Sequence, residues 1–459
     1  MRTSLSFVVG FFLIAGAANA AVTISDAPTK HMQCSAGACV PTAKKAFLNK
    51  TDLANMLAAS DIKVYTGNGA VSITVNSSFS WTSANRLTLE AYHSIAFRAA
   101  VIVAGTGSVT LTPDTANDGG TLTFFPGGSI DFWDTESSLI VSGVPYTLVS
   151  NIPTLAIDIG ANPSGAYALS KNYDAFVDGI YLHAPIQTPF TGVFHGLGHT
   201  IDRLSINDST AEENVGLFAR VDPQGRISNI ALTSYSVSGV AGNIGGLVGD
   251  NRGLLDGVSA SGGTGNAEGQ IAGQSFGTIQ HSQATVQMLY SGFAGGGGIV
   301  GYNGDTGRID DCHATGSIGG VYAGGGIAAT NAGVIINSSA GVDVETVFGD
   351  GLAGGLVGLI YDSGQIHQSF ATGNVTFNGT QGAKHPPKAT GVQIGGLAGS
   401  SQGLIADSYA LGSVSANARG NARDDVGGLV GRLNPYDGQI HRTYSTGHVS
   451  IVRGYLGGS

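Results

Sequence analysis

A glycine-flanked apolar residue recurs along the second half of this chain and restricts the folds that the chain can adopt. The repeated unit reads Gly-Gly-Leu or Gly-Gly-Ile in most copies, often followed by Val-Gly. A segment of some thirty residues cannot bury an apolar face alone, but stacked copies bury a continuous core between them. The repeat therefore predicts a solenoid. Its first apolar anchors are Leu217, Leu247, Ile271, Ile299, Ile327, Leu356, Leu397 and Leu429.

Two further apolar positions accompany the repeat. A second anchor follows in a Gly-x-Ile or Gly-x-Leu unit, and in most copies a third lies a constant distance beyond it. Three anchors predict three short strands per coil, in an all-β, right-handed parallel β-helix whose hydrogen bonds run between coils. The second anchors are Ile227, Leu255, Ile279, Ile309, Ile335, Ile366, Ile405 and Ile440. The third anchors are Met288, Ile318, Val344, Val375, Val414 and Val449.

Composition agrees with a folded, glycine-rich β protein. The 459 residues include 73 glycines, 42% hydrophobic residues and only 11% charged residues, whereas disorder requires low hydrophobicity and many charges. The formal net charge is −10, and no basic stripe is present that would neutralise phosphates. The sequence therefore argues against a nucleic-acid partner.

The chain divides into five predicted segments. Residues 1–20 resemble a secretory signal, with Arg2, the apolar run Phe7–Ala15 and an Ala-x-Ala site; that run is too short to span a bilayer, so no transmembrane span is expected in the mature chain. The others are a lead-in with a capping helix (21–60), N-terminal β-helix coils (61–150), an inserted connection (151–189) and the repeat solenoid (190–459). The chain ends on what looks like the opening of another repeat, which favours a longer array.

The N-terminal segment carries two local predictions. Thr51–Ala59 is expected to form a short helix, with Thr51 as its N-cap, that covers the open end of the solenoid. Cys34 and Cys39 flank a short glycine-containing loop, which in an exported protein favours a disulfide. The third cysteine, Cys312, occupies a recurring small, polar position and is expected to be a buried, inert thiol.

The later repeats resemble a known family. Gly354–Gly358 with Gly364–Val375, and the equivalent segments of the next two repeats, are similar to the GLUG motif. GLUG repeats occur in bacterial surface and secreted proteins, including filamentous-haemagglutinin-like adhesins and IgA-specific metallopeptidases. The resemblance, over about residues 190–459, implies a β-solenoid exoprotein. It leaves the activity open, because the repeat is scaffold.

No catalytic constellation accompanies the scaffold. None of the eleven histidines is followed by glutamate, so the zinc-protease pattern His-Glu-x-x-His is absent. The Asp-Asp pairs Asp310-Asp311 and Asp424-Asp425 form no carboxylate column through adjacent coils, as acid/base cleavage of a polysaccharide would require. We therefore expect a non-enzymatic protein with no cofactor and no metal.

Two groups of residues are candidates for ligand binding. Phe370, Tyr409 and Tyr444 occupy equivalent places in three consecutive repeats. Stacked coils would align their rings, which would bind sugar rings if exposed; burial in the core is the favoured alternative. The longest insertion, Thr376–Gln393, contains a cationic run with Lys384, His385 and Lys388. A tolerated surface loop is the favoured alternative for that run.

The sequence thus favours a secreted or cell-surface adhesin-like protein. Its expected partners are glycans or proteins of host or bacterial surfaces, and an outer-membrane secretion partner is a further expectation. The alternatives are a β-helix enzyme acting on polysaccharide and a spacer that holds another domain away from the cell.

Overall fold

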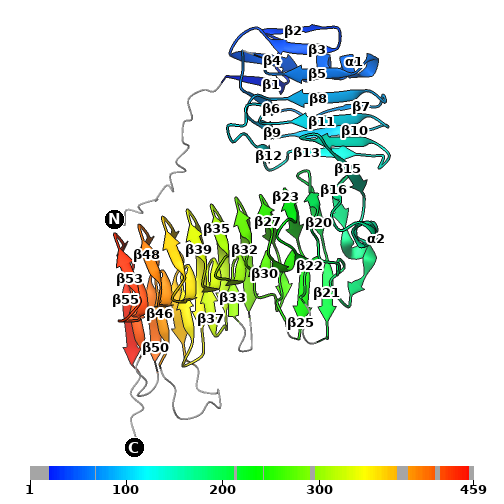
Figure 1. The fold of residues 1–459 in the computed structure, drawn as a ribbon. Coiled ribbons are helices and arrows are strands. Elements are labelled where there is room, and N and C mark those ends of the chain that lie inside the picture. Colours follow the sequence, from blue (N-terminus) through cyan, green and yellow to red (C-terminus); the bar gives the residue numbers. More distant parts are fainter. Residues whose placement is uncertain are drawn as a thin grey trace, which may run out of the picture. The chain divides into compact units, whose positions relative to one another are not determined.

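The computed structural model describes residues 20–67, 69–210, 214–240, 242–289, 295–379, 391–418 and 424–453. It contains two compact units, each built almost entirely from short parallel strands (Figure 1). The first unit comprises residues up to Ser129 together with Leu139–Gly143, and the second comprises Ile130–Ser138 together with Val144 onward. The predicted signal peptide lies outside the described residues, apart from Ala20.

The first unit is a small β-helix in which equivalent strands stack in parallel. One sheet contains, in order, β12 (Leu122–Phe124), β9 (Ile95–Phe97), β6 (Ser72–Val75), β1 (Ala21–Ser25) and β4 (Lys45–Asn49). A second contains β3 (Ala38–Pro41), β5 (Ile62–Tyr65), β8 (Arg86–Glu90) and β11 (Ser108–Thr112), and a third pairs β7 (Phe79–Trp81) with β10 (Ala100–Val103). The segment expected to be an extended lead-in therefore contributes β1 to the middle of a sheet, where it is paired on both edges.

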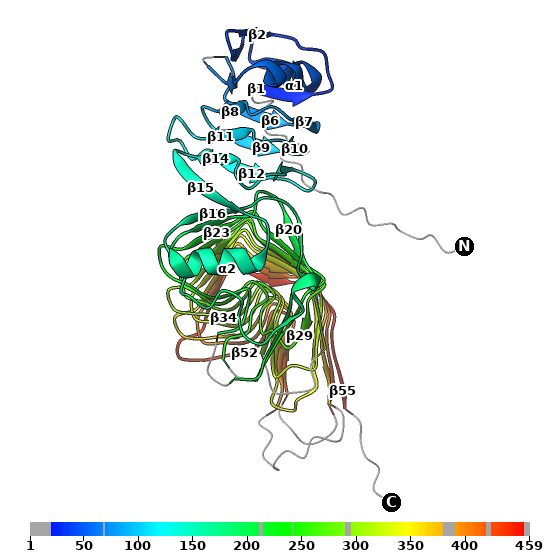
Figure 2. The same cartoon turned by 90° about the vertical axis from the view of Figure 1, so that its right-hand side faces the viewer.

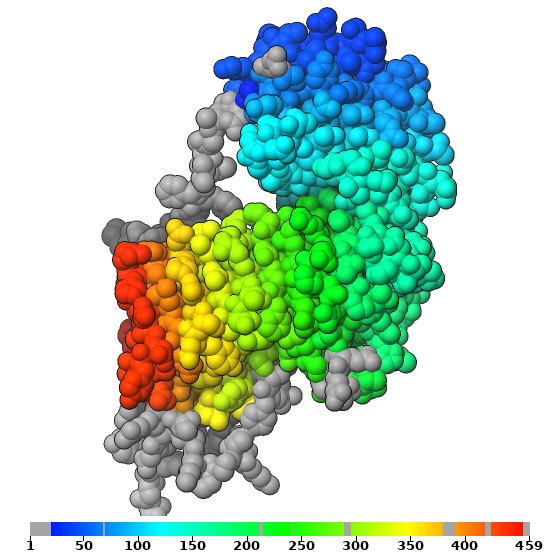
Figure 3. Space-filling view, in the orientation of Figure 1, coloured from blue at the N-terminus to red at the C-terminus, as the bar shows by residue number. Residues whose placement is uncertain are grey.

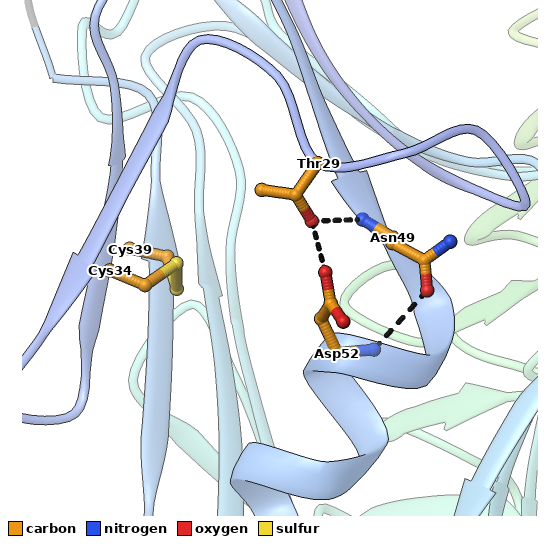
Figure 4. Close-up of a disulfide and its surroundings, with 5 residues drawn as sticks. All are labelled: Thr29, Cys34, Cys39, Asn49 and Asp52. Carbon is orange, nitrogen blue, oxygen red and sulfur yellow. Dashed lines mark hydrogen bonds between the residues drawn. A yellow bond between two sulfur atoms is a disulfide. The ribbon is translucent and has the colours of Figure 1, made fainter.

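The predicted N-terminal helix is present as α1 (Lys50–Ala59) and occupies the place that a strand takes in later coils. Its N-cap is Asn49 rather than Thr51, because the Asn49 side chain accepts hydrogen bonds from the backbone N–H groups of Thr51 and Asp52. Figure 4 shows the bond from Asp52. Leu53 and Leu57 are fully buried. The helix therefore covers one end of the coil with apolar side chains, as the sequence predicts.

The segment expected to be an inserted connection contains strands that the sequence did not predict. The expected connection, 151–189, contains α2 (Ile152–Ala161), β16 (Ala166–Leu169), β17 (Tyr173–Asp174), the 3-10 helix η1 (Ala175–Asp178) and β18 (Ile180–Tyr181). The side chain of Asn151 caps α2 by accepting the N–H of Thr154 at 2.8 Å, and proline is tolerated in the first turn. The three strands pair in parallel with strands of the next coil, so this segment forms the first coil of the solenoid.

Successive coils of the solenoid stack side by side in chain order (Figures 2 and 3). A coil contains up to five strands, which we assign to a glycine sheet and to a first, second and third sheet in chain order, and the third sheet takes two of them in the last three coils. The glycine sheet contains β33 (Gly295–Gly297), β37 (Ala323–Gly325), β41 (Leu352–Gly354), β46 (Gln393–Gly395) and β51 (Asp425–Gly427). The first sheet contains β22 (Phe218–Val221), β26 (Val248–Asn251), β30 (Ala272–Ser275), β34 (Val300–Asn303), β38 (Ala328–Asn331), β42 (Val357–Ile360), β47 (Ala398–Ser401) and β52 (Val430–Leu433).

The second and third sheets follow in every coil, and the early coils add a separate sheet that contains β18, β21 (Ser205–Asp208), β25 (Ser236–Gly239) and β29 (Thr264–Gly265). The second sheet contains β19 (Val193–His195), β23 (Arg226–Ser228), β27 (Leu254–Asp256), β31 (Thr278–Gln280), β35 (Arg308–Asp310), β39 (Val334–Ile336), β43 (Gln365–His367), β48 (Leu404–Ala406) and β53 (Gln439–His441). The third sheet contains β20 (Thr200–Asp202), β24 (Ala231–Thr233), β28 (Ser259–Ser261), β32 (Gln283–Leu289), β36 (His313–Gly319), β40 (Ser339–Thr346), β44 (Phe370–Ala371), β45 (Val375–Asn378), β49 (Tyr409–Ala410), β50 (Val414–Ala418), β54 (Tyr444–Ser445) and β55 (Val449–Arg453).

The register confirms the parallel β-helix and its three columns of anchors. The second anchors are aligned without interruption from Ile227 to Ile440, and the third anchors from Met288 to Val449. First anchors are linked by backbone hydrogen bonds, such as Ile299 N–H to Ile327 at 2.9 Å. The expectation of three strands per coil was incomplete, because the first anchor lies at a bend between two short strands. The hand of the coil stays a prediction.

The paired glycines are required by close backbone approach, both within a coil and between neighbouring coils. A Cβ on Gly297 would lie 1.9 Å from the carbonyl oxygen of Val300 in its own coil and 2.8 Å from the backbone nitrogen of Ala329 in the next, and one on Gly298 would lie 2.0 Å from the carbonyl oxygen of Gly326 in the next coil. Neither glycine has a positive φ. The positive-φ position of each coil lies instead two residues after the second anchor, where a short corner joins the second and third sheets. It is occupied by Asn229, Gly257, His281, Asp311, Asn337, Gln368, Asp407 and Arg442.

A buried hydroxyl column runs beside the second sheet, where the sequence predicted a tight internal column. The Ser369 Oγ accepts the backbone N–H of Ser338 at 3.1 Å and donates to the carbonyl of His367 at 2.7 Å. Ser338 and Ser408 make the equivalent bonds in their own coils. Each hydroxyl therefore satisfies two buried backbone groups, one of them in the preceding coil.

We predict that Ser369→Ala lowers the free energy of unfolding by about 1–3 kcal/mol, because the buried N–H of Ser338 loses its acceptor. Urea unfolding followed by circular dichroism measures the change. Cys312→Ser is the matched control in the same column, and it is expected to be tolerated because a hydroxyl can make the bonds that the thiol makes. Unchanged stability of Ser369→Ala would contradict the role of the column.

Candidate functional site

The three candidate aromatic residues form a stacked row, the ring ladder, composed of Phe370, Tyr409 and Tyr444. Each begins a two-residue strand of the third sheet, and the parallel register pairs Phe370 with Tyr409 and Tyr409 with Tyr444. The ring centroids are 4.9 Å and 5.1 Å apart, with interplanar angles of 1° and 6°. The rings therefore repeat at about the spacing of neighbouring strands.

The ring ladder lies on the outer face of the solenoid rather than in its core. Ala371 and Ala410, the next residues along their strands, are fully buried, so the rings point to the opposite face. Tyr444 is 54% exposed, whereas Phe370 and Tyr409 are half-buried. Partial burial, together with Tyr444, raises the pKa of Tyr409. The arrangement thus differs from the buried-core alternative that the sequence favoured.

Stacking determines which atoms of the ring ladder remain available. Each face-to-face contact hides one face of both rings, so a ligand meets ring edges, the outer faces of Phe370 and Tyr444, and the tyrosine hydroxyls. Among the described residues, no protein group forms a hydrogen bond with the hydroxyl of Tyr409 or Tyr444. These hydroxyls are available to a polar ligand.

A charged pair borders the ring ladder at the corner between the second and third sheets. The Arg442 guanidinium donates two hydrogen bonds to the carboxylate of Asp407 in the preceding coil, with Nη2 and Oδ2 2.7 Å apart. The bonds from Arg442 hold the pKa of Asp407 below its usual range. The planar pair offers further donors and acceptors beside the rings.

The other predicted residues do not join this surface in the structure. Lys384, His385 and Lys388 lie outside the described residues. Cys34 and Cys39 belong to the first unit, where they form a disulfide across β2 (Met32–Ser35) and β3 (Figure 4).

The carboxylates at the corners are engaged in local ion pairs. Asp310 accepts hydrogen bonds from Arg308 at 2.6 Å and from Asn337 at 3.0 Å, and these bonds lower its pKa against the effect of burial.

Among the described residues, His93, Asp114 and Asp118 are the one group with metal-ligating atoms close enough together to hold an ion. They already bond to one another, because His93 contacts Asp118 at 2.6 Å and Asp114 accepts the N–H of Asp118.

The free thiol is inaccessible. Cys312 is fully buried, and burial raises its pKa to about 12. Its Sγ lies 3.4 Å from the carbonyl oxygen of Asp310. A neutral thiol with this environment is a poor nucleophile.

Two buried histidines lie at the start of the solenoid. The Nδ1 of His195 accepts the N–H of Leu197 at 2.9 Å, and a ring nitrogen of His199 lies 2.9 Å from the carbonyl of Ile130. Burial lowers the pKa of His195 from 6.5 to about 3 and also lowers that of His199. Both rings are therefore neutral at pH 7, and protonation of His195 would also remove its acceptor.

We predict that acid destabilises this segment through His195. Its folded pKa lies below its unfolded value, so its contribution is complete above pH 6.5 and decreases by about 1.4 kcal/mol per pH unit as the pH falls towards 3. Between pH 6.5 and 5 the wild-type protein should lose about 2 kcal/mol more than His195→Asn. Urea unfolding of both proteins at the two pH values measures the difference, and equal losses would contradict the assignment.

Sequence reasoning missed a second aromatic group on the solenoid. Phe276, Tyr302 and Tyr361 gather where the first sheet turns into the second. The available signal was positional: Phe276 and Tyr361 both lie five residues after a first anchor, and Tyr302 lies three residues after one.

Comparison with known proteins supports the repeat assignment. A family model described as the GLUG motif matches residues 294–319, which include β33, β34, β35 and β36. The chain therefore carries a GLUG motif, whereas the filamentous-haemagglutinin-like type stays a prediction. Halomucin from Haloquadratum walsbyi (strain DSM 16790 / HBSQ001) is 31% identical over 144 residues, which are 31% of this chain and 1% of that protein. No solved structure matches this chain.

Proposed function

We propose that this chain is an exported or surface-located, non-catalytic solenoid that attaches to polysaccharide, as an adhesin does. The exposed ring ladder is the observation that carries the proposal, because aligned rings with available hydroxyls suit a ligand that is both apolar and rich in hydroxyls. The GLUG motif and the likeness to Halomucin favour an exported or surface repeat protein. Among the described residues, neither helix is long and apolar enough to cross a membrane.

The geometry of the ring ladder favours an extended glycan that lies along the solenoid axis. Its rings repeat every 4.9–5.1 Å, close to the length of one sugar residue in an extended chain. Each sugar would then meet an aromatic ring, and weak contacts would add over the three coils.

Two alternative functions remain distinct in their consequences. An enzyme that cleaves polysaccharide would shorten the glycan, and the ion-paired state of Asp310 and Asp407 gives no support to acid/base work. A spacer would bind no glycan at all. Measurement of retention and of glycan chain length therefore separates the three functions.

We predict that the purified protein is retained on at least one immobilised host or bacterial polysaccharide without shortening it. Tyr409→Ala removes the central ring of the ring ladder and should weaken retention about tenfold, since one lost aromatic contact is worth about 1.4 kcal/mol. Tyr409→Phe keeps the ring and tests the hydroxyl alone. Retention on the resin and size analysis of released sugar are the readouts.

Ser339→Ala is the matched control, because Ser339 pairs with Phe370 in the same row of the third sheet but carries no ring. It should bind as the wild type does. Shortened glycan would overturn the non-catalytic function. Wild-type retention by Tyr409→Ala, with thermal unfolding showing a folded variant, would overturn the ring ladder as the binding surface.

A further inference from the structure

A second aromatic surface, the corner cluster, lies where the first sheet turns into the second. We define it as Arg252, Gln274, Phe276, Tyr302 and Tyr361. The outer row of the first sheet aligns Gln274 with Tyr302, while Arg252, Phe276 and Tyr361 lie in the turns that follow their strands. The corner cluster therefore belongs to a different face of the coil from the ring ladder.

The rings of the corner cluster are arranged edge to face. Phe276 and Tyr302 have centroids 5.8 Å apart at 81°, and Tyr302 and Tyr361 have centroids 6.4 Å apart at 86°. Tyr302 reaches Tyr361 across an intervening coil whose equivalent residues, Thr330 and Ala332, are small. An edge-to-face contact hides only one ring face, whereas a stacked contact hides two. More aromatic face thus remains available here than on the ring ladder.

Unpaired polar groups accompany these rings. Arg252 bonds through Nε to Asp250 at 2.9 Å, and its guanidinium lies 5.6 Å from the ring of Phe276. Among the described residues, its two terminal nitrogens, the amide of Gln274 and the hydroxyls of Tyr302 and Tyr361 have no hydrogen-bond partner in the chain. Arg252 and Tyr361 are both 41% exposed, so their unpaired groups are open to solvent, whereas Gln274 and Tyr302 are half-buried.

A buried carboxylate holds the guanidinium in place. Asp250 is 2% exposed, and its Oδ2 contacts both Arg252 and, at 3.9 Å, Arg220. Its Oδ1 has no hydrogen-bond partner among the described residues. Arg220 also pairs with Asp222 at 2.6 Å. Two arginines thus face two aspartates, and the set carries no net charge.

We propose that the corner cluster binds a neutral glycan, with a sugar ring on Tyr361 or Tyr302 and its hydroxyls on Arg252 and Gln274. Exposed aromatic faces beside unpaired donors and acceptors match a ligand with apolar C–H faces and a rim of hydroxyls. The balanced charge of the site and the net charge of −10 of the chain disfavour an acidic polysaccharide. This site is separate from the ring ladder, so it does not depend on glycan binding there.

Cellohexaose, mannohexaose and laminarihexaose are suitable neutral probes, and hexagalacturonate is the acidic comparator. Isothermal titration of the full protein should detect at least one neutral probe, and Tyr361→Ala should weaken its binding at least fivefold. Tyr436→Ala is the matched control, because Tyr436 is a 91% exposed tyrosine in the equivalent turn of the last described coil, outside the corner cluster. It should leave the affinity unchanged.

Gly304→Ala provides a second test that keeps every side chain of the corner cluster. The added methyl would lie 2.3 Å from a ring atom of Phe276, so the ring must move and the affinity should fall. Tyr409→Ala separates this site from the ring ladder, because its loss of binding alone would place the glycan there. Absence of binding by all neutral probes, preference for hexagalacturonate, or wild-type affinity of folded Tyr361→Ala and Gly304→Ala would each overturn the proposal.

Discussion

Backbone contact between neighbouring coils is the constraint on which the rest of the solenoid depends. At the first anchor, the N–H of one coil donates to the carbonyl of the next, and the coils approach so closely that a Cβ on Gly298 would overlap the carbonyl oxygen of Gly326 in the next coil. Glycine is required there because it has no side chain, not because the turn needs a positive φ. The glycine pair therefore recurs in the sequence because each coil makes the same close backbone contact.

One coil lacks the second glycine of the pair and packs a larger side chain at that position. Gln270 stands where the second glycine of the pair is expected, and it is buried at 2% exposure. The hydroxyl of Tyr235 donates a hydrogen bond to the side chain of Gln270. The Tyr235 ring packs so closely on Gly263 that a Cβ there would overlap it. In the same coil, Glu268 occupies an apolar column, and burial raises its pKa to about 7.

The sequence predicted those features that recur as similar residues in each coil and missed those that occur once or recur with unlike residues. Anchors such as Ile309 and Val375 were found because apolar residues recur at a fixed place. Helix α2 occurs once, in the segment expected to be an inserted connection; Asn151 caps it, and Pro153 needs no hydrogen-bond partner in its first turn. The positive-φ position between the second and third sheets was missed because residues as different as Asn, Asp, His, Gln and Arg occupy it. The tertiary context of each coil therefore overrides local preference there.

The orientation of aromatic rings was equally beyond sequence reasoning, and it changes what each surface offers a ligand. Phe370, Tyr409 and Tyr444 are aligned in consecutive coils and their rings stack, so most of their ring faces are covered by the neighbouring rings. Tyr302 and Tyr361 are two coils apart, and their rings meet at a right angle across the small residues between them. Rings on alternate coils therefore keep faces on which a sugar can stack, whereas rings on consecutive coils offer a ligand their edges and hydroxyls.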